Sequence, residues 1–285
     1  MRRVSVVVLT MGDRPDALRA AIDSARSQAG VEVEVIVIGN GCHPAIEAPG
    51  VRVIASDSNV GVAAGRNLGW EAATAPVVLF LDDDARYGSE AVAATAAARF
   101  AVRSELAVMS FRILDEGGRV ISKHIPMLWK ANSGRTTDVT TFLGGACAVR
   151  RSVWEQVGGF PPEFFYALEE TDLAWRVLDH GGAIEYAGDL EVIHPSLPLS
   201  LRQDAIRNTA RSRILLARRR LPVPLAVVYL AVRGLMSLGT VRSFGDIGAL
   251  LGGYRAGFTD PIEARAPLRW RTAWKMLRLG RPPVI

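Results

Sequence analysis

Three consecutive aspartates, Asp82, Asp83 and Asp84, follow an apolar run at residues 77–81. Such a run is typical of a buried strand, so the carboxylates are expected where that strand ends. Adjacent carboxylates repel one another unless a cation lies among them, and their hard oxygen atoms suit Mg²⁺ or Mn²⁺. The sequence therefore predicts a divalent-cation site here, to which phosphates could add oxygen ligands. The alternative is an acidic turn in solvent.

A second group of carboxylates, Glu169, Glu170 and Asp172, stands at the start of a predicted amphipathic helix over residues 169–180. A helix N-terminus stabilises negative charge, so capping alone would explain Asp172. A carboxylate placed there can equally act as a general base toward an acceptor hydroxyl. His194 follows a predicted short strand, and a lone histidine is more often structural than functional.

Small residues and one arginine fill the segment 59–67, at the start of a predicted helix. Gly65 and its small neighbours permit close approach of a ligand to the backbone, and Arg66 could bind a diphosphate through two hydrogen bonds. Tight packing of this helix on a sheet would need the same small residues. The two interpretations are compatible.

The elements that must position these residues alternate between strand and helix. Strands are predicted over 4–10, 33–40, 51–56, 76–84 and 106–113, helices over 15–28, 60–73 and 88–103, a strand running into a short helix over 142–151, and two short strands between the 169–180 helix and His194. This alternation indicates an α/β domain with a mostly parallel central sheet flanked by helices. Ligands of such sheets bind beyond the carboxyl ends of the strands.

Charge divides the chain into two parts. Residues 1–201 carry 18 basic and 25 acidic residues, a net charge of −7, whereas residues 202–285 carry 16 basic and 4 acidic residues, a net charge of +12. Pro195 and Pro198 break regular structure between them. We therefore expect a folded domain over 1–200 and a basic helical region over 201–285.

The basic region contains an arginine-rich helix at 211–221 and an apolar segment at 222–236, which is too short to span a bilayer easily. We expect these helices either to lie at the inner leaflet of a membrane, to pack on the domain, or to form a contact between copies of the chain. A nucleic-acid partner is not expected, because the aromatic residues are not interleaved as a stacking platform.

Only two cysteines, Cys42 and Cys147, occur in the chain, and they form neither a disulfide framework nor a zinc-ligand pattern. They fit a reducing compartment, so a cytoplasmic location is expected. The apolar start of the chain is interpreted as the first buried strand and not as a signal peptide.

Five motifs occur in the order found in family 2 glycosyltransferases, which the chain resembles over roughly residues 3–195. The motifs are SVVVLT at 5–10, NVGVAAGRNLG at 59–69, LDDD at 81–84, LGGACAVRR at 143–151 and FFYALEETDLAWRVLDHGG at 164–182, followed by a strand ending at His194. The best match is to the bacterial rhamnosyltransferase-like and galactofuranosyltransferase-like branch. This resemblance implies the GT-A fold, a Rossmann-like nucleotide-binding half continuous with an acceptor half.

The resemblance also implies roles for individual residues. The residues expected to bind the nucleotide sugar are Thr10, Arg14, Asn40, Gly65, Arg66, Asn67, Asp82 and Asp83, and those expected to bind the metal are Asp82, Asp84 and His194. Glu170 stands where the family usually has the catalytic aspartate, and Glu169 and Asp172 are the alternative bases. A second departure is Gly39, which stands where similar enzymes have an aspartate that reads the nucleotide base, so the base must be recognised otherwise.

These assignments together predict an inverting, Mn²⁺- or Mg²⁺-dependent transfer of a hexosyl or deoxyhexosyl group from a nucleoside-diphosphate sugar. The acceptor is expected to be a hydroxyl of a lipid-linked or cell-envelope glycan or of a small molecule. A sugar-nucleotide pyrophosphorylase is disfavoured because the TMGDRP sequence at 10–15 lacks a glycine-rich loop with arginine and lysine. A non-catalytic sugar-nucleotide-binding or membrane-surface protein with the same fold is the alternative function.

Overall fold

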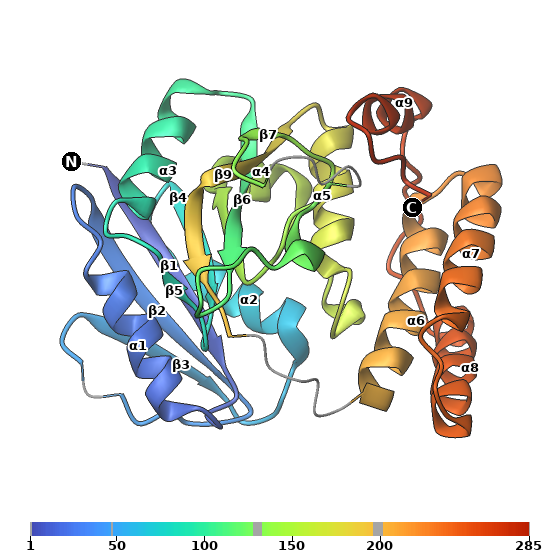
Figure 1. The fold of residues 1–285 in the computed structure, drawn as a ribbon, viewed down its shortest axis with the longest axis horizontal. Helices are drawn as coiled ribbons and strands as arrows, with labels where there is room; N and C mark the ends of the chain where they lie inside the picture. Colours follow the sequence, from blue (N-terminus) through green and yellow to red (C-terminus); the bar gives the residue numbers. More distant parts are fainter. Residues whose placement is uncertain (1, 47, 128–132, 196–201, 285) are drawn as a thin grey trace.

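A central sheet with helices on both faces forms the larger part of the molecule (Figure 1). The computed structural model describes residues 2–46, 48–127, 133–195 and 202–284. Within these residues the strands are β1 (Arg3–Thr10), β2 (Glu32–Asn40), β3 (Val51–Ser56), β4 (Val77–Asp82), β5 (Arg86–Tyr87), β6 (Leu106–Leu114), β7 (Thr137–Asp138), β8 (Ala146–Arg150) and β9 (Ala183–Ile193).

The sheet has the strand order β3-β2-β1-β4-β8-β6-β9-β5, and β7 pairs with β9. Strands β3, β2, β1 and β4 are parallel to one another, as are β6 and β9. Strand β8 lies antiparallel between β4 and β6, and β5 and β7 lie antiparallel to β9. The predicted mostly parallel α/β sheet is therefore confirmed, and β8 is the antiparallel strand at its centre.

Strand β1 shows why this sheet must be covered on both sides. Its valines are all buried, but Val7 packs into one apolar cluster while Val4, Val6 and Val8 pack into another. Side chains of a strand alternate between the two faces of its sheet, so a run of valines needs a core on each face. The continuous apolar run is thus the local cause of a three-layer arrangement.

The two faces are covered by different helices. Helices α1 (Pro15–Arg26) and α3 (Val92–Val102) bury their apolar residues in one cluster, and α2 (Gly61–Ala72), α4 (Arg151–Val157) and α5 (Glu169–Asp179) bury theirs in the other. Two short 3₁₀ helices, η1 (Ser122–His124) and η2 (Pro162–Phe164), lie in the connections. The expected two short strands before His194 are in fact the single strand β9, which changes register opposite Phe111 and Arg112 of β6.

Four further helices make up the C-terminal region, namely α6 (Arg202–Arg220), α7 (Val223–Leu238), α8 (Phe244–Thr259) and α9 (Trp270–Arg278). Helix α6 lies between the sheet domain and the pair α7 and α8 (Figure 1). The boundary expected at 195–201 falls almost wholly outside the described residues. None of the helices in the described part of the chain has the length and apolarity needed to cross a membrane.

Candidate active site

The functional candidates gather where the parallel strands end. Thr10 ends β1, Asn40 ends β2 and Asp82 ends β4. The register pairs Leu9 with Asp82 and Thr10 with Gly39, so the three strand ends lie side by side at one edge of the sheet. This is the edge at which open α/β sheets bind their ligands.

Asp82, Asp84 and His194 form a compact group at this edge. One ligand atom from each residue lies within 4.8 Å of the other two. The Nε2 atom of His194 is 3.2 Å from Oδ1 of Asp84 and 3.8 Å from Oδ2 of Asp82. The Asp82 carboxylate, followed by that of Asp84, raises the pKa of His194 above its usual value, against the opposing effect of burial. Two carboxylates and an imidazole are a donor set that suits Mn²⁺, and Mg²⁺ accepts the oxygen atoms.

Asp83 points into the protein and fixes the acidic turn. Its carboxylate accepts a 2.6 Å hydrogen bond from the Thr10 hydroxyl and pairs with Arg14 at 2.8 Å. Arg14 also contacts Asp84. Burial raises the pKa of Asp83 to about 6 despite these two partners, with the neighbouring aspartates contributing. Thr10 and Arg14, which we expected beside the nucleotide, therefore hold the turn that presents the Asp82, Asp84 and His194 group.

Arg66 connects this group to the second set of carboxylates. Its guanidinium is buried and lies 2.8 Å from Oε1 of Glu169 and 3.4 Å from Oδ1 of Asp82. The nearby His194 ring, followed by the charge of Arg66, holds the pKa of Asp82 below its usual value, although burial alone would raise it. The side chain expected to meet a diphosphate thus spans the distance between Asp82 and Glu169.

Two glycines make room for this connection. A Cβ atom on Gly144 would come within 2.2 Å of the Arg66 guanidinium, and one on Gly145 would come within 1.9 Å of the Asp82 carboxylate. No side chain fits at either position without moving a charged group. The LGG sequence at 143–145 is therefore required by the geometry of the site.

Glu170 differs from Glu169 in its surroundings. Glu169 is buried against Arg66, whereas Glu170 keeps part of its surface exposed. Burial and the adjacent Glu169 carboxylate raise the pKa of Glu170 well above its usual value. A partly exposed carboxylate with a raised pKa is a better proton acceptor near neutral pH than an ordinary one.

The loop before α5 has an unusual backbone. Phe165, Ala167 and Leu168 have φ angles of 58°, 68° and 68°, a region that non-glycine residues rarely occupy. The carbonyl of Phe165 accepts a 2.7 Å hydrogen bond from the Val62 amide, and that of Tyr166 accepts one of 3.0 Å from the Ser212 hydroxyl of α6. Strain of this kind persists only where surrounding contacts enforce it, and it is frequent at functional sites.

Comparison with known proteins fits this arrangement. The sequence profile of glycosyl transferase family 2 matches residues 5–158. The chain belongs to glycosyl transferase family 2. A search of curated proteins finds no significant match.

Solved structures share the fold of this family 2 chain. GalNAc-T7, solved with UDP, GalNAc and Mn²⁺, has 13% identity and a TM-score of 0.54, over 72% of this chain and 48% of that chain. S. aureus TarS 1-349 has 19% identity and a TM-score of 0.52, over 75% of this chain and 66% of that chain. The same TarS fragment has also been solved in complex with UDP. The chain therefore spans about half the length of the GalNAc-T7 chain and just under two thirds of the TarS fragment. At these identities the likeness establishes the GT-A fold alone.

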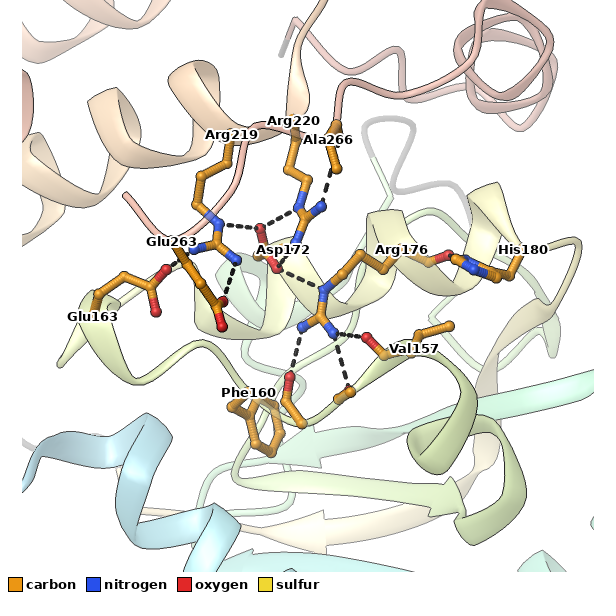
Figure 2. Close-up of polar contacts among 12 residues, drawn as sticks. Val157, Phe160, Glu163, Asp172, Arg176, His180, Arg219, Arg220, Glu263 and Ala266 are labelled. Atoms are coloured by element: carbon orange, nitrogen blue, oxygen red, sulfur yellow. Dashed lines mark hydrogen bonds and ion pairs between the residues drawn. The ribbon is translucent and has the colours of Figure 1, made fainter. Parts of the chain in front are cut away.

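Three arginines, Arg176, Arg219 and Arg220, surround Asp172 in this family 2 chain (Figure 2). It has no exposed surface, and its oxygen atoms accept hydrogen bonds from Arg176 at 2.8 Å and from Arg220 at 2.6 and 3.2 Å. Arg219 lies 3.5 Å away and also contacts Glu163. Both oxygen atoms are thus occupied by arginines, and Asp172 is not free to accept a proton from an acceptor. These contacts favour the structural role of Asp172 over that of a base.

Three other expected ligand-binding residues have structural partners. Asn67 donates a 2.8 Å hydrogen bond to the Phe160 carbonyl and accepts one of 2.9 Å from its amide. Asn40 accepts a 2.8 Å hydrogen bond from the Val60 amide. A Cβ atom on Gly65 would lie 2.6 Å from Leu9, which favours the tight-packing interpretation of that glycine. These residues shape the family 2 site through its backbone.

Gly39 departs from the family pattern for a steric reason. A Cβ atom there would lie 2.3 Å from the Cys42 carbonyl oxygen and 2.6 Å from Pro44. The turn after β2 therefore closes over the position at which similar enzymes carry an aspartate. A carboxylate could be accommodated only if this turn moved.

Sequence reasoning missed His124, which lies in the loop-rich stretch between β6 and β8. Its ring packs edge-on against that of His194, with 6.2 Å between the ring centres. Burial, followed by the charges of Lys123 and His194, lowers the pKa of His124 to about 4. A neutral ring beside His194 adds no charge to the group. No sequence pattern places the two histidines together, because they lie on different elements.

Proposed function

We propose that this protein transfers a glycosyl group from a nucleoside-diphosphate sugar to a hydroxyl acceptor. The observation that carries the proposal is the buried guanidinium of Arg66, which contacts Asp82 through one terminal nitrogen and Glu169 through the other. Arg66 therefore lies between two sets of carboxylates: Asp82 and Asp84, which suit a cation bound to a diphosphate, and Glu169 and Glu170, which suit proton transfer. Glycosyl transfer by in-line displacement needs both functions in one site.

Asp82, Asp84 and His194 are the residues that would hold a divalent cation, Mn²⁺ or Mg²⁺. The cation would neutralise the departing diphosphate as a Lewis acid. Arg14 contacts Asp84 and stands beside the same group, so it is placed to meet a phosphate that enters there.

Glu170 is the proposed base. It takes the proton of the acceptor hydroxyl as this oxygen attacks the anomeric carbon from the face opposite the diphosphate, which inverts the configuration. Glu169 cannot do this as easily because Arg66 neutralises it. The nearby Glu169 carboxylate in turn favours the protonated form of Glu170, which stabilises the proton once Glu170 has accepted it.

The nature of the donor follows from the neighbours and the motifs. GalNAc-T7 was solved with UDP, GalNAc and Mn²⁺ and TarS with UDP, so uridine diphosphate sugars are the first donors to test. The resemblance to rhamnosyltransferases and galactofuranosyltransferases makes a hexosyl or deoxyhexosyl donor our proposal, and Gly39 leaves its nucleotide base to be found by experiment. The acceptor would be a lipid-linked or cell-envelope glycan or a small molecule, used in the cytoplasm.

The test is a thermal-shift panel of nucleoside diphosphates and their sugars, with and without Mn²⁺, followed by donor turnover with the donor that stabilises most. Glu170→Gln should abolish most turnover and leave the donor-induced shift in place. Glu155→Gln, an exposed substitution on α4, is the matched control. Wild-type turnover in Glu170→Gln would reject this base, and a donor shift without turnover in the wild type would favour the non-catalytic sugar-nucleotide-binding alternative.

We further propose that helices α7, α8 and α9 rest on an anionic lipid surface at the inner face of the plasma membrane. Thirteen of the eighteen large apolar side chains exposed in the described residues lie on these helices, among them Leu235, Phe244 and Trp274. Exposed arginines accompany them, with Arg242 and Arg255 near α8 and Arg271 on α9. Apolar and aromatic side chains interspersed with arginines are complementary to a bilayer surface that carries negative headgroups.

Vesicle flotation tests this partner. Full-length protein should float with vesicles that contain an anionic phospholipid, and a Phe244→Ser, Trp274→Ser double variant should float several-fold less. Val102→Ser, which removes an 80% exposed valine from α3, is the control. Equal flotation of the double variant would reject the lipid surface. A dimer that forms without vesicles and is lost in the double variant would assign the same face to a second copy of the chain.

A further inference from the structure

A small cavity lies where the C-terminal region meets helix α5. Its wall includes Leu168, which precedes α5, and Thr171 and Trp175 on one face of α5. Tyr229 of α7 and Met276 of α9 complete the apolar part of the wall. Its volume of about 30 Å³ has room for about two or three water molecules, each of which needs about 10–15 Å³. Thr171 directly follows Glu170 in sequence, so the cavity lies on the face of α5 adjacent to the proposed base.

Two arginines line this cavity without a carboxylate beside them. Within the described residues, neither Arg233 of α7 nor Arg281 forms an ion pair, whereas Arg66, Arg176, Arg219 and Arg220 all do. The Nε atom of Arg233 is buried and has no hydrogen-bond partner. Burial lowers the pKa of Arg281, and the nearby positive charge of Arg233 lowers it further. The two like charges are therefore close together and only partly hydrated.

The remaining polar groups of the cavity are hydroxyls. Thr140, Thr141 and Thr171 line it, and the Thr141 and Thr171 hydroxyls lie 3.5 Å apart. Hydroxyls can donate to an anion but carry no charge to balance a guanidinium. The Arg233 guanidinium lies over the Tyr229 ring, 5.6 Å from the ring centre, but the ring carries no negative charge. Two adjacent cations with no anion between them cost free energy, because partly buried charge needs an opposite charge.

We propose that this cavity binds a phosphate-type oxyanion through Arg233 and Arg281. Guanidinium groups match the geometry of phosphate oxygens and can bind them through paired hydrogen bonds. The threonine hydroxyls supply further donors to the same anion. The volume is far too small for a whole nucleotide, which distinguishes this site from the donor site at Asp82.

The location identifies the source of the anion as a phosphoryl group carried by the acceptor. An acceptor anchored here by its phosphate would present a nearby hydroxyl to Glu170 from the side of the C-terminal helices. This assignment of the source rests on the proposed function, whereas anion binding by the cavity does not.

The test compares melting temperatures of the full-length chain in EDTA, with inorganic phosphate or a short-chain alkyl phosphate monoester against sodium chloride of equal ionic strength. The wild type should melt about 3 °C higher when the site is close to saturated. Arg233→Gln and Arg281→Gln should each lose this shift, and Arg281→Lys, which keeps the charge, should keep part of it. Arg26→Gln, which replaces an exposed arginine of α1, should retain the whole shift.

Equal phosphate shifts in the wild type, Arg233→Gln and Arg281→Gln would overturn the site. A larger shift with the monoester than with inorganic phosphate supports the acceptor as the source, and a shift with inorganic phosphate alone overturns that assignment. The Mn²⁺-dependent shift with nucleoside diphosphate is measured in parallel on the same proteins. If the wild type shows no such Mn²⁺-dependent shift, the result counts against the proposed function and not against the anion site.

Discussion

Asp172 offers the sharpest test of how the two parts of the chain are joined. Replacing it with asparagine keeps its size and removes its charge, while Arg176, Arg219 and Arg220 stay around it. The NH₂ group of the new asparagine would face guanidinium groups, and both are hydrogen-bond donors, so no hydrogen bond could form between them. The substitution therefore leaves a surplus positive charge at a position with no exposed surface.

The expected cost follows from this burial. Removing one partner of a buried ion pair typically costs about 3–5 kcal/mol. A loss of 1 kcal/mol lowers the melting temperature of a chain of this size by about 2–4 °C, so Asp172→Asn should melt about 10 °C below the wild type. Differential scanning calorimetry or circular dichroism at pH 7 would measure the difference.

Asp57→Asn is the matched control, because the Asp57 side chain is 98% exposed and pairs only with His43 among the described residues. It should melt within about 1 °C of the wild type, as expected for a surface pair. The reasoning is refuted if Asp172→Asn also melts within about 2 °C of the wild type. Turnover measured well below the melting temperature separates the two roles, since loss of turnover in a protein of normal stability would make Asp172 a candidate base again.

Three further predictions concern the site itself. The rate of transfer should fall on the acid side at a higher pH than an ordinary carboxylate would give, because the base must be deprotonated and the pKa of Glu170 is raised; a pH–rate profile of the wild type measures this. Gly145→Ala should weaken Mn²⁺-dependent donor binding at least tenfold by displacing Asp82, whereas Gly248→Ala, with open space around it, should not; titration calorimetry compares them. Asp84→Ala should remove the difference in donor affinity with and without Mn²⁺, and an unchanged difference would reject the metal role.

The sequence was informative wherever one segment determines its own structure. The apolar run before Asp82 fixes a buried strand, and the helix that begins at Glu169 follows from its apolar spacing. Burial on both faces then required helices on both sides of the sheet. These features depend on neighbours within a few residues, so local patterns suffice to predict them.

Features that depend on distant partners could not be predicted in this way. Asp172 has the same local pattern as a capping or catalytic carboxylate, and only Arg219 and Arg220, more than forty residues further along the chain, fix it in the interior. The pairing of β8 between β4 and β6 is equally non-local, as is the contact of His124 with His194. In each case the deciding neighbour lies on another element.

The same kind of non-local contact determines the position of the proposed base, Glu170. The strained residues Phe165, Ala167 and Leu168 lead directly into Glu169 and Glu170, and each such backbone conformation costs about 1–3 kcal/mol unless other contacts enforce it. Those contacts come from α2 through the Val62 amide and from α6 through Ser212. Helix α6 also holds the first turns of α5 through Asp172. The C-terminal region is therefore part of what sets the orientation of Glu170, so substitutions in α6 can alter catalysis without contacting a substrate.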